Sequence, residues 1–131
     1  MKLDHLGIAV ADLGKALTRW APLLGEPRGP PEVVASQRVR VAFLAAGGSH
    51  VELLEPTDPE SPIGRFLATR GNGLHHVAFE VPNVDQALAE VVRTGGRVVD
   101  AVGRPGARGR RVGFAHPSAF GGTLVEFVEG P

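Results

Sequence analysis

Residues 4–17 read DHLGIAVADLGKAL, and residues 75–88 repeat this pattern as HHVAFEVPNVDQAL at a spacing of 71. A second match follows at a spacing of 74, where VELLE at residues 51–55 corresponds to VEFVE at residues 125–129. The change from 71 to 74 corresponds to a connection that is three residues longer in the second copy. Two copies are too few for a solenoid, which needs at least three stacked repeats. The repeat therefore predicts a duplicated module whose copies are related by a pseudo-two-fold axis.

Within each copy, the sequence predicts a strand, a helix and three further strands. Alternating apolar and polar residues indicate the strands, and the glycines at 47 and 48 indicate a hairpin. The predicted strands span residues 3–10, 32–36, 39–45 and 49–55 in the first copy, and residues 74 onward, 97–101, 110–116 and 122–128 in the second. The predicted helices run from the cap Asp12 to Gly25, from Ser61-Pro62 to Gly71, and from the cap Asn83 to Gly95-Gly96. We expect an α+β fold with repeat units of residues 3–56 and 74–129 in a single domain of residues 1–131.

The composition is typical of one globular domain, with 131 residues of which 43% are apolar. Acidic and basic residues balance at 14 each, so no long-range field attracts nucleic acid or an anionic membrane. Cysteine is absent, which excludes disulfides, thiol nucleophiles and thiolate metal sites. The sequence has neither the long apolar run of a membrane span nor the pattern of a secretory leader. We expect a cytoplasmic protein with no nucleic-acid partner and no membrane partner.

Two kinds of metal-binding side chain occupy equivalent positions in the two copies. His5 corresponds to His76, and Glu52 corresponds to Glu126. A single histidine in a strand is usually a hydrogen-bonded core residue, but core packing gives no reason to duplicate both an imidazole and a carboxylate. Imidazole and carboxylate together suit Zn²⁺, Co²⁺, Ni²⁺, Mn²⁺ or Fe²⁺. The repeat therefore predicts that the four side chains converge on one divalent metal ion.

Successive side chains of a strand point to opposite faces, so the polar residues near the predicted ligands lie either on the ligand face or on the opposite face. His75 is predicted to point away from the metal ligands and to be structural or to support a ligand. Glu55 and Glu129 also face away, and we interpret them as solvated charges. His50 lies two residues before Glu52 and shares its face, which leaves three roles open: a further ligand, a proton shuttle or a residue at the rim.

A basic segment, Arg104–Arg111, reads RPGARGRR. Its simplest interpretation is an exposed, flexible loop. The functional interpretation is a glycine-rich backbone whose guanidinium groups contact a phosphate or carboxylate of a substrate. The segment is short and has no interleaved aromatic residues, so nucleic-acid binding is not expected.

Five stretches of the chain resemble the methylmalonyl-CoA epimerases of the vicinal oxygen chelate superfamily. They are DHLGIAV, VAFL, VELLEP, SPIGRFLATRGNGLHHVAFEV and FAHPSAFGGTLVEF, and the resemblance covers residues 3–128. It implies two paired βαβββ modules that form a metal-binding cup, and a homodimer. It also implies an acyl-CoA substrate and interconversion of (2R)- and (2S)-methylmalonyl-CoA. Carried over by position, the implied metal ligands are His5, Glu52, His76 and Glu126. Co²⁺ is the foremost candidate, with Mn²⁺, Ni²⁺, Zn²⁺ and Mg²⁺ as alternatives.

The resemblance also implies a mechanism, in which a divalent metal stabilises an enolate while a base removes the C2 proton. Glu126 would be both ligand and base. Some epimerases carry a second glutamate where this chain has Val41, which cannot transfer a proton. The Gly47-Gly48 hairpin is expected to place Phe43 near Glu52, with Val41 on the same face of the cup. His50 is close by, and we take it as the substitute.

Two further departures concern the substrate, because the family often has lysine at the place of Ser118 and glycine at the place of Arg38. Neither changes the implied metal ligands.

Three other functions are weighed against the epimerase. A glyoxalase-I-type lyase uses the same order of ligands, and the context around Pro56, residues 61–70 and His116 favours the epimerase. A non-haem iron dioxygenase would normally use two histidines and one carboxylate, so the acid at position 52 argues against it. A non-catalytic small-molecule-binding protein of this fold is the alternative from a different class, and such proteins often lack metal ligands that this chain retains.

Overall fold

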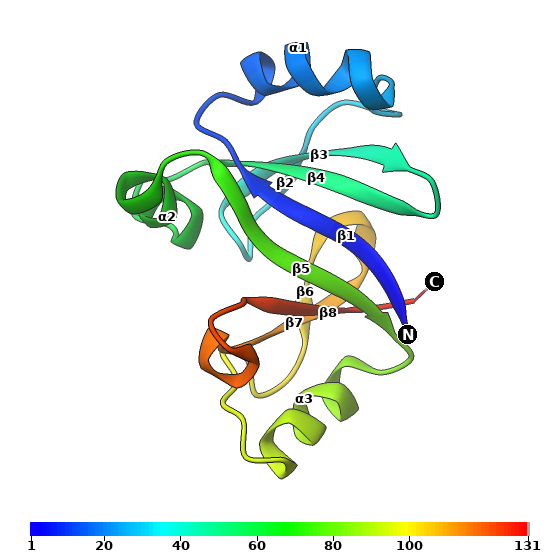
Figure 1. Cartoon of the computed structure of the whole chain (residues 1–131), viewed down its shortest axis with the longest axis vertical. Helices are drawn as coiled ribbons and strands as arrows, with labels where there is room; N and C mark the ends of the chain where they lie inside the picture. Colours follow the sequence, from blue (N-terminus) through cyan, green and yellow to red (C-terminus); the bar gives the residue numbers. More distant parts are fainter. Residues whose placement is uncertain (131) are drawn as a thin grey trace. The chain divides into compact units, whose positions relative to one another are not determined.

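The computed structural model describes residues 1–130 (Figure 1). The strands are β1 (Lys2–Ala9), β2 (Glu32–Val34), β3 (Val39–Ala46), β4 (Ser49–Pro56), β5 (Gly73–Val81), β6 (Arg104–Pro105), β7 (Arg111–Ala115) and β8 (Val125–Glu129). The α-helices are α1 (Leu13–Leu24), α2 (Pro62–Arg70) and α3 (Val84–Arg93), and two 3-10 turns are η1 (Ala107–Gly109) and η2 (Pro117–Phe120). The chain divides into an N-terminal unit, residues 5–75, and a C-terminal unit, residues 1–4 with those from 76 onward. The predicted α+β fold of two βαβββ modules is confirmed.

The N-terminal unit carries four strands in the order β2-β3-β4-β1. β3 and β4 form the predicted antiparallel hairpin, and β1 pairs with β4 in parallel. Helix α1 begins after Asp12, whose side chain accepts a hydrogen bond from the amide of Lys15. This helix lies along one face of the strands (Figure 1) and covers a layer of apolar side chains. The buried members of that layer are Val10, Leu13, Ala42, Leu44, Val51 and Leu53.

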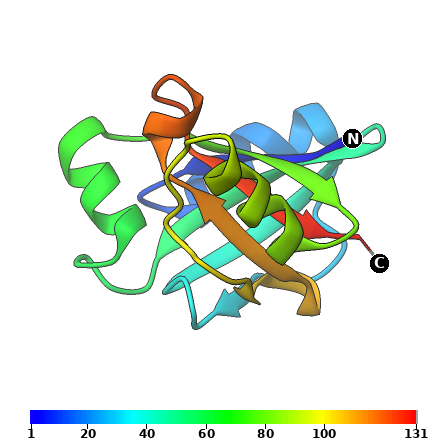
Figure 2. The ribbon, with the colours of Figure 1, turned by 90° about the horizontal axis from the view of Figure 1, so that it is seen from below.

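The C-terminal unit repeats this arrangement, with the strand order β5-β8-β7-β6. β5 pairs with β8 in parallel, and β8 pairs with β7 antiparallel. Asn83 caps α3 by accepting a hydrogen bond from the amide of Gln86, as Asp12 does for α1. Figure 2 shows α3 crossing the face of β7, where it covers the second apolar layer. The buried members of this layer are Val81, Val84, Leu88, Val91, Ala115, Val125 and Phe127.

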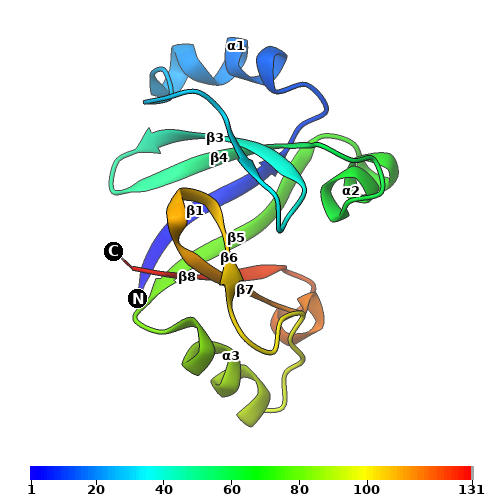
Figure 3. The ribbon, with the colours of Figure 1, turned by 180° about the vertical axis from the view of Figure 1, so that it is seen from behind.

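Helix α2, visible beside the β3–β4 hairpin in Figure 3, begins and ends where the sequence predicts. The Ser61 hydroxyl accepts a hydrogen bond from the amide of Gly64, and Pro62 occupies the first turn. A Cβ atom at Gly64 would lie 2.3 Å from the carbonyl oxygen of Pro59, so only glycine fits there. Gly71 closes the helix with a φ of 74°.

One predicted strand is wrong. Residues 97–101 make only an isolated bridge between Val98 and Ala115. The reason is Asp100, whose carboxylate accepts a hydrogen bond from the amide of Phe114 and so replaces a backbone ladder bond. The outer strand of the C-terminal unit is instead β6, whose Arg104 pairs with Val112 as Glu32 pairs with Val41 in the N-terminal unit.

The last strand also begins later than expected, at Val125 rather than at residue 122. Gly121 and Gly122 have φ angles of 64° and 100°, which are incompatible with an extended strand. The longest helix, α1, has 12 residues, and no helix in residues 1–130 is long and apolar enough to cross a membrane.

Candidate functional site

A buried histidine–glutamate pair lies in the N-terminal unit. Strands β1 and β4 pair in parallel, with Gly7 opposite Glu52. The side chains of His5 and Glu52 therefore project from adjacent strands. The Nε2 atom of His5 lies 3.2 Å from Oε1 of Glu52. Both residues are buried, with 3% and 4% of their surfaces exposed. A carboxylate so far from water requires a partner, and the imidazole is one.

The C-terminal unit contains the equivalent pair. There the parallel pairing of β5 and β8 places Ala78 opposite Glu126, the same register as in the N-terminal unit. The Nε2 atom of His76 lies 3.0 Å from Oε1 of Glu126, and both residues are again buried. The repeat in the sequence therefore corresponds to a repeat in side-chain geometry.

An aromatic ring contacts the histidine of each pair. Phe43 lies opposite Glu52 in the β3–β4 register, and its ring meets the His5 imidazole edge-on at a centroid distance of 5.7 Å. Phe114 lies opposite Glu126 and meets His76 in the same way at 5.6 Å. Edge-to-face contacts favour one orientation of a ring over others. Each imidazole is therefore held by a carboxylate on one neighbouring strand and by a phenyl ring.

The chemistry of these side chains suits a divalent metal. Two imidazole nitrogens and two carboxylate oxygens match the preferences of borderline and hard divalent cations. All four residues are buried, and each unit contributes one imidazole and one carboxylate: His5 and Glu52 in the N-terminal unit, His76 and Glu126 in the C-terminal unit.

The neighbouring histidines occupy different surroundings. His50 lies opposite His5 in the β1–β4 register and meets the ring of Phe43 edge-on at 6.1 Å. The ring of Phe43 thus contacts the imidazoles of both His5 and His50. His75 instead packs against Phe66 of α2 at 5.0 Å, which agrees with the prediction that it serves the structure.

The position that lacks an acid, Val41, is fully buried in the N-terminal unit. It lies opposite Leu54 in the β3–β4 register, so two apolar residues occupy the place where a second proton-transfer group would be expected. Nothing at this position can exchange a proton.

The interpretation of Glu55 and Glu129 as solvated charges is wrong. The Glu55 carboxylate accepts a hydrogen bond of 2.8 Å from the amide of Leu13, the first residue of α1. Glu129 accepts one of 3.0 Å from the amide of Val84, the first residue of α3. A helix leaves its first amides without intrahelical partners, and a carboxylate there also complements the helix dipole. Both glutamates therefore attach a helix to a strand next to the site, and their repetition in the sequence was the signal.

The interpretation of Arg104–Arg111 as a flexible, exposed loop is also wrong for Arg110. The Arg110 side chain is only 14% exposed and donates to Asp4, at 2.8 Å, and to Glu80, at 3.3 Å. Its Nε also donates to the carbonyl of Glu129 at 2.8 Å. The loop is thus attached to β1, β5 and β8 within the C-terminal unit.

The other arginines of this segment also have acidic partners: Arg104 with Asp100, Arg108 with Asp4, and Arg111 with Asp85 and Glu129. The amide of Gly103 and the guanidinium of Arg111 lower the pKa of Asp85. Sequence reasoning missed Asp4, which is 97% buried and precedes the first ligand histidine, because an acid near the start of a strand is ordinarily solvated.

Of the two substrate-related departures, Arg38 has a clear structural consequence. Its φ is 55°, in the left-handed region that favours glycine, the residue common at this place in the family that the sequence resembles. The Arg38 guanidinium donates a hydrogen bond to Asp58 at 2.9 Å. Ser118 donates its amide to Nδ1 of His116, and its hydroxyl lies 2.8 Å from the same atom.

Comparison with known proteins gives one family and consistent relatives. The family model of the Glyoxalase/Bleomycin resistance protein/Dioxygenase superfamily matches residues 4–114. An ethylmalonyl-CoA/methylmalonyl-CoA epimerase from Cereibacter sphaeroides is 37% identical, over 98% of this chain and 97% of its own length. The mitochondrial methylmalonyl-CoA epimerase of Bos taurus is also 37% identical, over 98% of this chain and 74% of its own.

A solved structure agrees. A single-residue variant of the Streptomyces coelicolor methylmalonyl-CoA epimerase, in complex with 2-nitronate-propionyl-CoA, superposes with a TM-score of 0.92 at 36% identity. The match covers 99% of this chain and 94% of that one. These findings confirm the resemblance that the sequence motifs indicate.

Proposed function

Because the chain belongs to the Glyoxalase/Bleomycin resistance protein/Dioxygenase superfamily, we propose that it is an epimerase that interconverts (2R)- and (2S)-methylmalonyl-CoA. The support is threefold: epimerases are similar along the whole chain, one of them binds an acyl-CoA analogue, and the buried donor set suits a Lewis acid. Cereibacter sphaeroides contributes a relative whose name includes ethylmalonyl-CoA, so the substrate class is a 2-alkylmalonyl-CoA.

The single observation that carries the proposal is the buried histidine–glutamate pair that recurs in the same register in each unit. We assign His5, Glu52, His76 and Glu126 as the ligands of one divalent metal ion, with Co²⁺ as the foremost candidate. Such an ion would polarise the substrate thioester and stabilise the enolate that forms when the C2 proton leaves.

Glu126 is assigned as the general base that removes the C2 proton. The nearby imidazole of His76, 3.0 Å away, fixes the orientation of its carboxylate. Epimerisation requires a second group that returns a proton to the opposite face of the planar intermediate. Val41 cannot do so, whereas His50 is a titratable residue outside the proposed ligand set and contacts the Phe43 ring beside the first pair. His50 is therefore assigned as this second group.

The remaining parts of the proposal follow from family membership. The two units act together as one catalytic domain, the active form is a homodimer, and the protein works in the cytoplasm. Light scattering after size-exclusion chromatography tests the homodimer directly, since the chain mass is 13.7 kDa.

The proposal is tested by following the C2 proton of methylmalonyl-CoA by NMR in D₂O. Co²⁺-loaded protein, chelated protein and a Glu126→Ala variant are run in parallel, with ethylmalonyl-CoA as a second substrate. We expect exchange well above the spontaneous background with loaded protein alone. Background exchange in all samples would refute the assignment, and a glutathione-dependent lyase assay would then decide on the glyoxalase-I-type alternative.

A further inference from the structure

In the C-terminal unit, a guanidinium group lies over the phenyl ring that contacts His76. The guanidinium carbon of Arg104 lies 5.5 Å from the centroid of the Phe114 ring, and this ring meets the His76 imidazole edge-on. Phe114 is only 7% exposed. The negative face of an aromatic ring attracts a cation, more strongly where water is excluded. A continuous series of contacts therefore leads from Arg104 through Phe114 to a proposed metal ligand.

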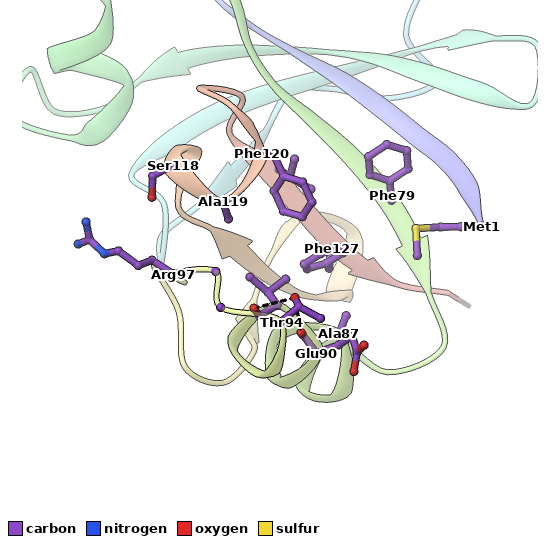
Figure 4. Close-up of a pocket in the computed structure, with 14 residues that line it drawn as sticks. Met1, Phe79, Ala87, Glu90, Thr94, Arg97, Ser118, Ala119, Phe120 and Phe127 are labelled. Atoms are coloured by element: carbon purple, nitrogen blue, oxygen red, sulfur yellow. Dashed lines mark hydrogen bonds between the residues drawn. The ribbon is translucent and has the colours of Figure 1, made fainter.

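These three side chains lie on the face of the sheet that carries Glu126. Phe127, the next residue along β8, lies on the opposite face, where it lines a groove beside α3 (Figure 4). Because successive side chains of a strand alternate between faces, Glu126 projects away from that groove. Phe114 lies directly opposite Glu126 in the β7–β8 register, and Arg104 pairs with Val112, two residues before Phe114. Arg104 is therefore on the same face as the proposed ligands.

One carboxylate, that of Asp100, contacts both the arginine and the phenylalanine. Its Oδ1 atom lies 3.2 Å from Nε of Arg104, and its Oδ2 atom accepts a hydrogen bond of 2.8 Å from the amide of Phe114. The Arg104 side chain is 33% exposed, so this ion pair is partly shielded from water. An ion pair also limits the conformations of a long side chain, which would otherwise be mobile. Asp100 thus fixes the backbone of Phe114 and the cation over its ring.

The N-terminal unit surrounds its equivalent phenyl ring with different groups. Glu32 of β2 occupies the place that Arg104 has in β6, and the negative face of a ring does not attract a carboxylate. The Phe43 ring of that unit instead meets His50 edge-on. The equivalent phenyl rings therefore have an imidazole as a second partner in one unit and a guanidinium in the other.

We propose that Arg104 is a positioning residue of the candidate metal site. By holding the Phe114 ring, it keeps the His76 imidazole in the orientation in which Nε2 faces the Glu126 carboxylate, 3.0 Å away. Without the guanidinium, the ring and the imidazole sample more orientations, and a ligand that must first be ordered binds a metal ion more weakly. This consequence for metal binding rests on the proposed function, whereas the contacts themselves do not.

Calorimetric titration of the metal-free protein with Co²⁺ measures the effect on the site. Arg104→Met keeps an unbranched side chain without the charge, and we expect it to weaken Co²⁺ binding about fivefold. Loss of a positive charge would by itself strengthen the binding of a cation, so the direction of the change separates positioning from electrostatics. Arg104→Lys retains a cation and should bind within about twofold of the unaltered protein. Arg93→Met, the matched control, removes an exposed arginine that is paired with Glu90, and should not weaken binding.

The metal-free protein tests the positioning independently. The chain has five histidines, and the ¹H–¹³C signal of the His76 ring is assigned with His76→Gln. This signal depends on the nearby ring of Phe114, so we expect Arg104→Met to shift or broaden it. The signal of His116, whose ring contacts Ser118, should stay unchanged. In a Phe114→Leu background, Arg104→Met should alter neither the signal nor the Co²⁺ affinity further, because the arginine acts through the ring.

The proposal is overturned if a folded Arg104→Met variant keeps the His76 signal of the unaltered protein, or binds Co²⁺ with unchanged affinity. It is also overturned if Arg104→Met has its full effect in the Phe114→Leu background. If Arg104→Met does not fold, Asp100→Asn takes its place in both measurements, because it removes the ion pair while its side-chain oxygen can still accept from the Phe114 amide. If the unaltered protein does not bind Co²⁺, the proposed metal site is refuted, and the His76 signal alone then decides whether Arg104 positions this imidazole.

Discussion

The two units share the residues that form and orient the candidate metal ligands, and they differ in the residues around these ligands. Each has a buried histidine–glutamate pair in one register, a phenyl ring edge-on to the histidine, and a glutamate that caps the helix. The residues around these shared features differ between the two units. Buried Val39 and Ala9 of the N-terminal unit correspond to Arg110 and Glu80, which form an ion pair in the C-terminal unit.

The comparison indicates which features the chemistry requires in duplicate. The candidate ligands and the phenyl rings beside them are repeated, whereas His50 corresponds to Leu124, so this neighbouring imidazole is not repeated. A symmetric set of donors can hold a metal, whereas in the proposed mechanism two different residues, Glu126 and His50, transfer protons at the two faces of the substrate. The predictions below test this division, beginning with the largest effect.

The two equivalent glutamates should differ in role. Glu126→Gln removes the assigned base, and we expect the rate of C2 proton exchange to fall by about 10³-fold. Glu52→Gln retains a side-chain oxygen that can serve as a ligand, and should lower the rate by about tenfold or less. Both variants are compared by exchange rate per bound metal. Equal losses in the two variants would contradict separate roles.

His50 is the catalytic assignment that breaks the symmetry, so its replacement by the residue of the other unit is informative. His50→Leu should lower the exchange rate by about 10²-fold while the metal content stays unchanged, because a proton-transfer group is lost and no ligand is. His75→Leu is the control, since His75 packs on Phe66 and should affect the rate little. An unchanged rate in His50→Leu would remove His50 from the mechanism.

Arg110 tests the difference in the surrounding layer. Arg110→Val introduces the residue that the N-terminal unit has at this place, and leaves the buried carboxylate of Asp4 with Arg108 at 3.4 Å as its remaining arginine. We expect the free energy of unfolding to fall by about 3 kcal/mol, the lower end of the range for removing one partner of a buried ion pair, because Arg108 remains beside Asp4. The double variant Asp4→Ala/Arg110→Val should recover part of this loss in urea denaturation. A double variant no more stable than the single one would show that the ion pair is not the cause.

The two glutamates that cap helices, Glu55 and Glu129, test a feature that both units share. Glu55→Ala and Glu129→Ala each remove the acceptor for the first amide of a helix, and each should lower the free energy of unfolding by about 1–2 kcal/mol. Glu26→Ala, an exposed acid with no such contact, should change it by less than about 0.5 kcal/mol. Losses no larger than that of the control would mean that the caps contribute nothing to stability.

The sequence predicts most of the fold because the repeat aligns the strands and the caps mark the helices. It also identifies two equivalent histidines and two equivalent glutamates as candidate ligands. Which histidine meets which glutamate depends on the pairing of β1 with β4 and of β5 with β8, which the sequence does not predict. It fails where a side chain takes over a backbone role. Asp100 replaces a ladder bond and abolishes a strand, and Glu55 and Glu129 satisfy helix amides 42 and 45 residues away. Such bonds depend on tertiary contacts that no local pattern encodes.

The smallest expected effect concerns Asp85, which stands where the N-terminal unit has Gly14. The amide of Gly103 and then the guanidinium of Arg111 lower the pKa of this exposed carboxyl in the folded protein. A lowered pKa means that the ionised form stabilises the fold above the unfolded-state pKa of about 3.9, and that this stabilisation is lost as the pH falls through the folded-state value. Asp85→Asn should therefore be slightly less stable than the unaltered protein at pH 7, and the difference should shrink towards pH 3. Urea denaturation at both pH values measures it. A difference that stays constant with pH would assign the effect to the shape of the side chain, and the charge at this position would then have no part in distinguishing the two units.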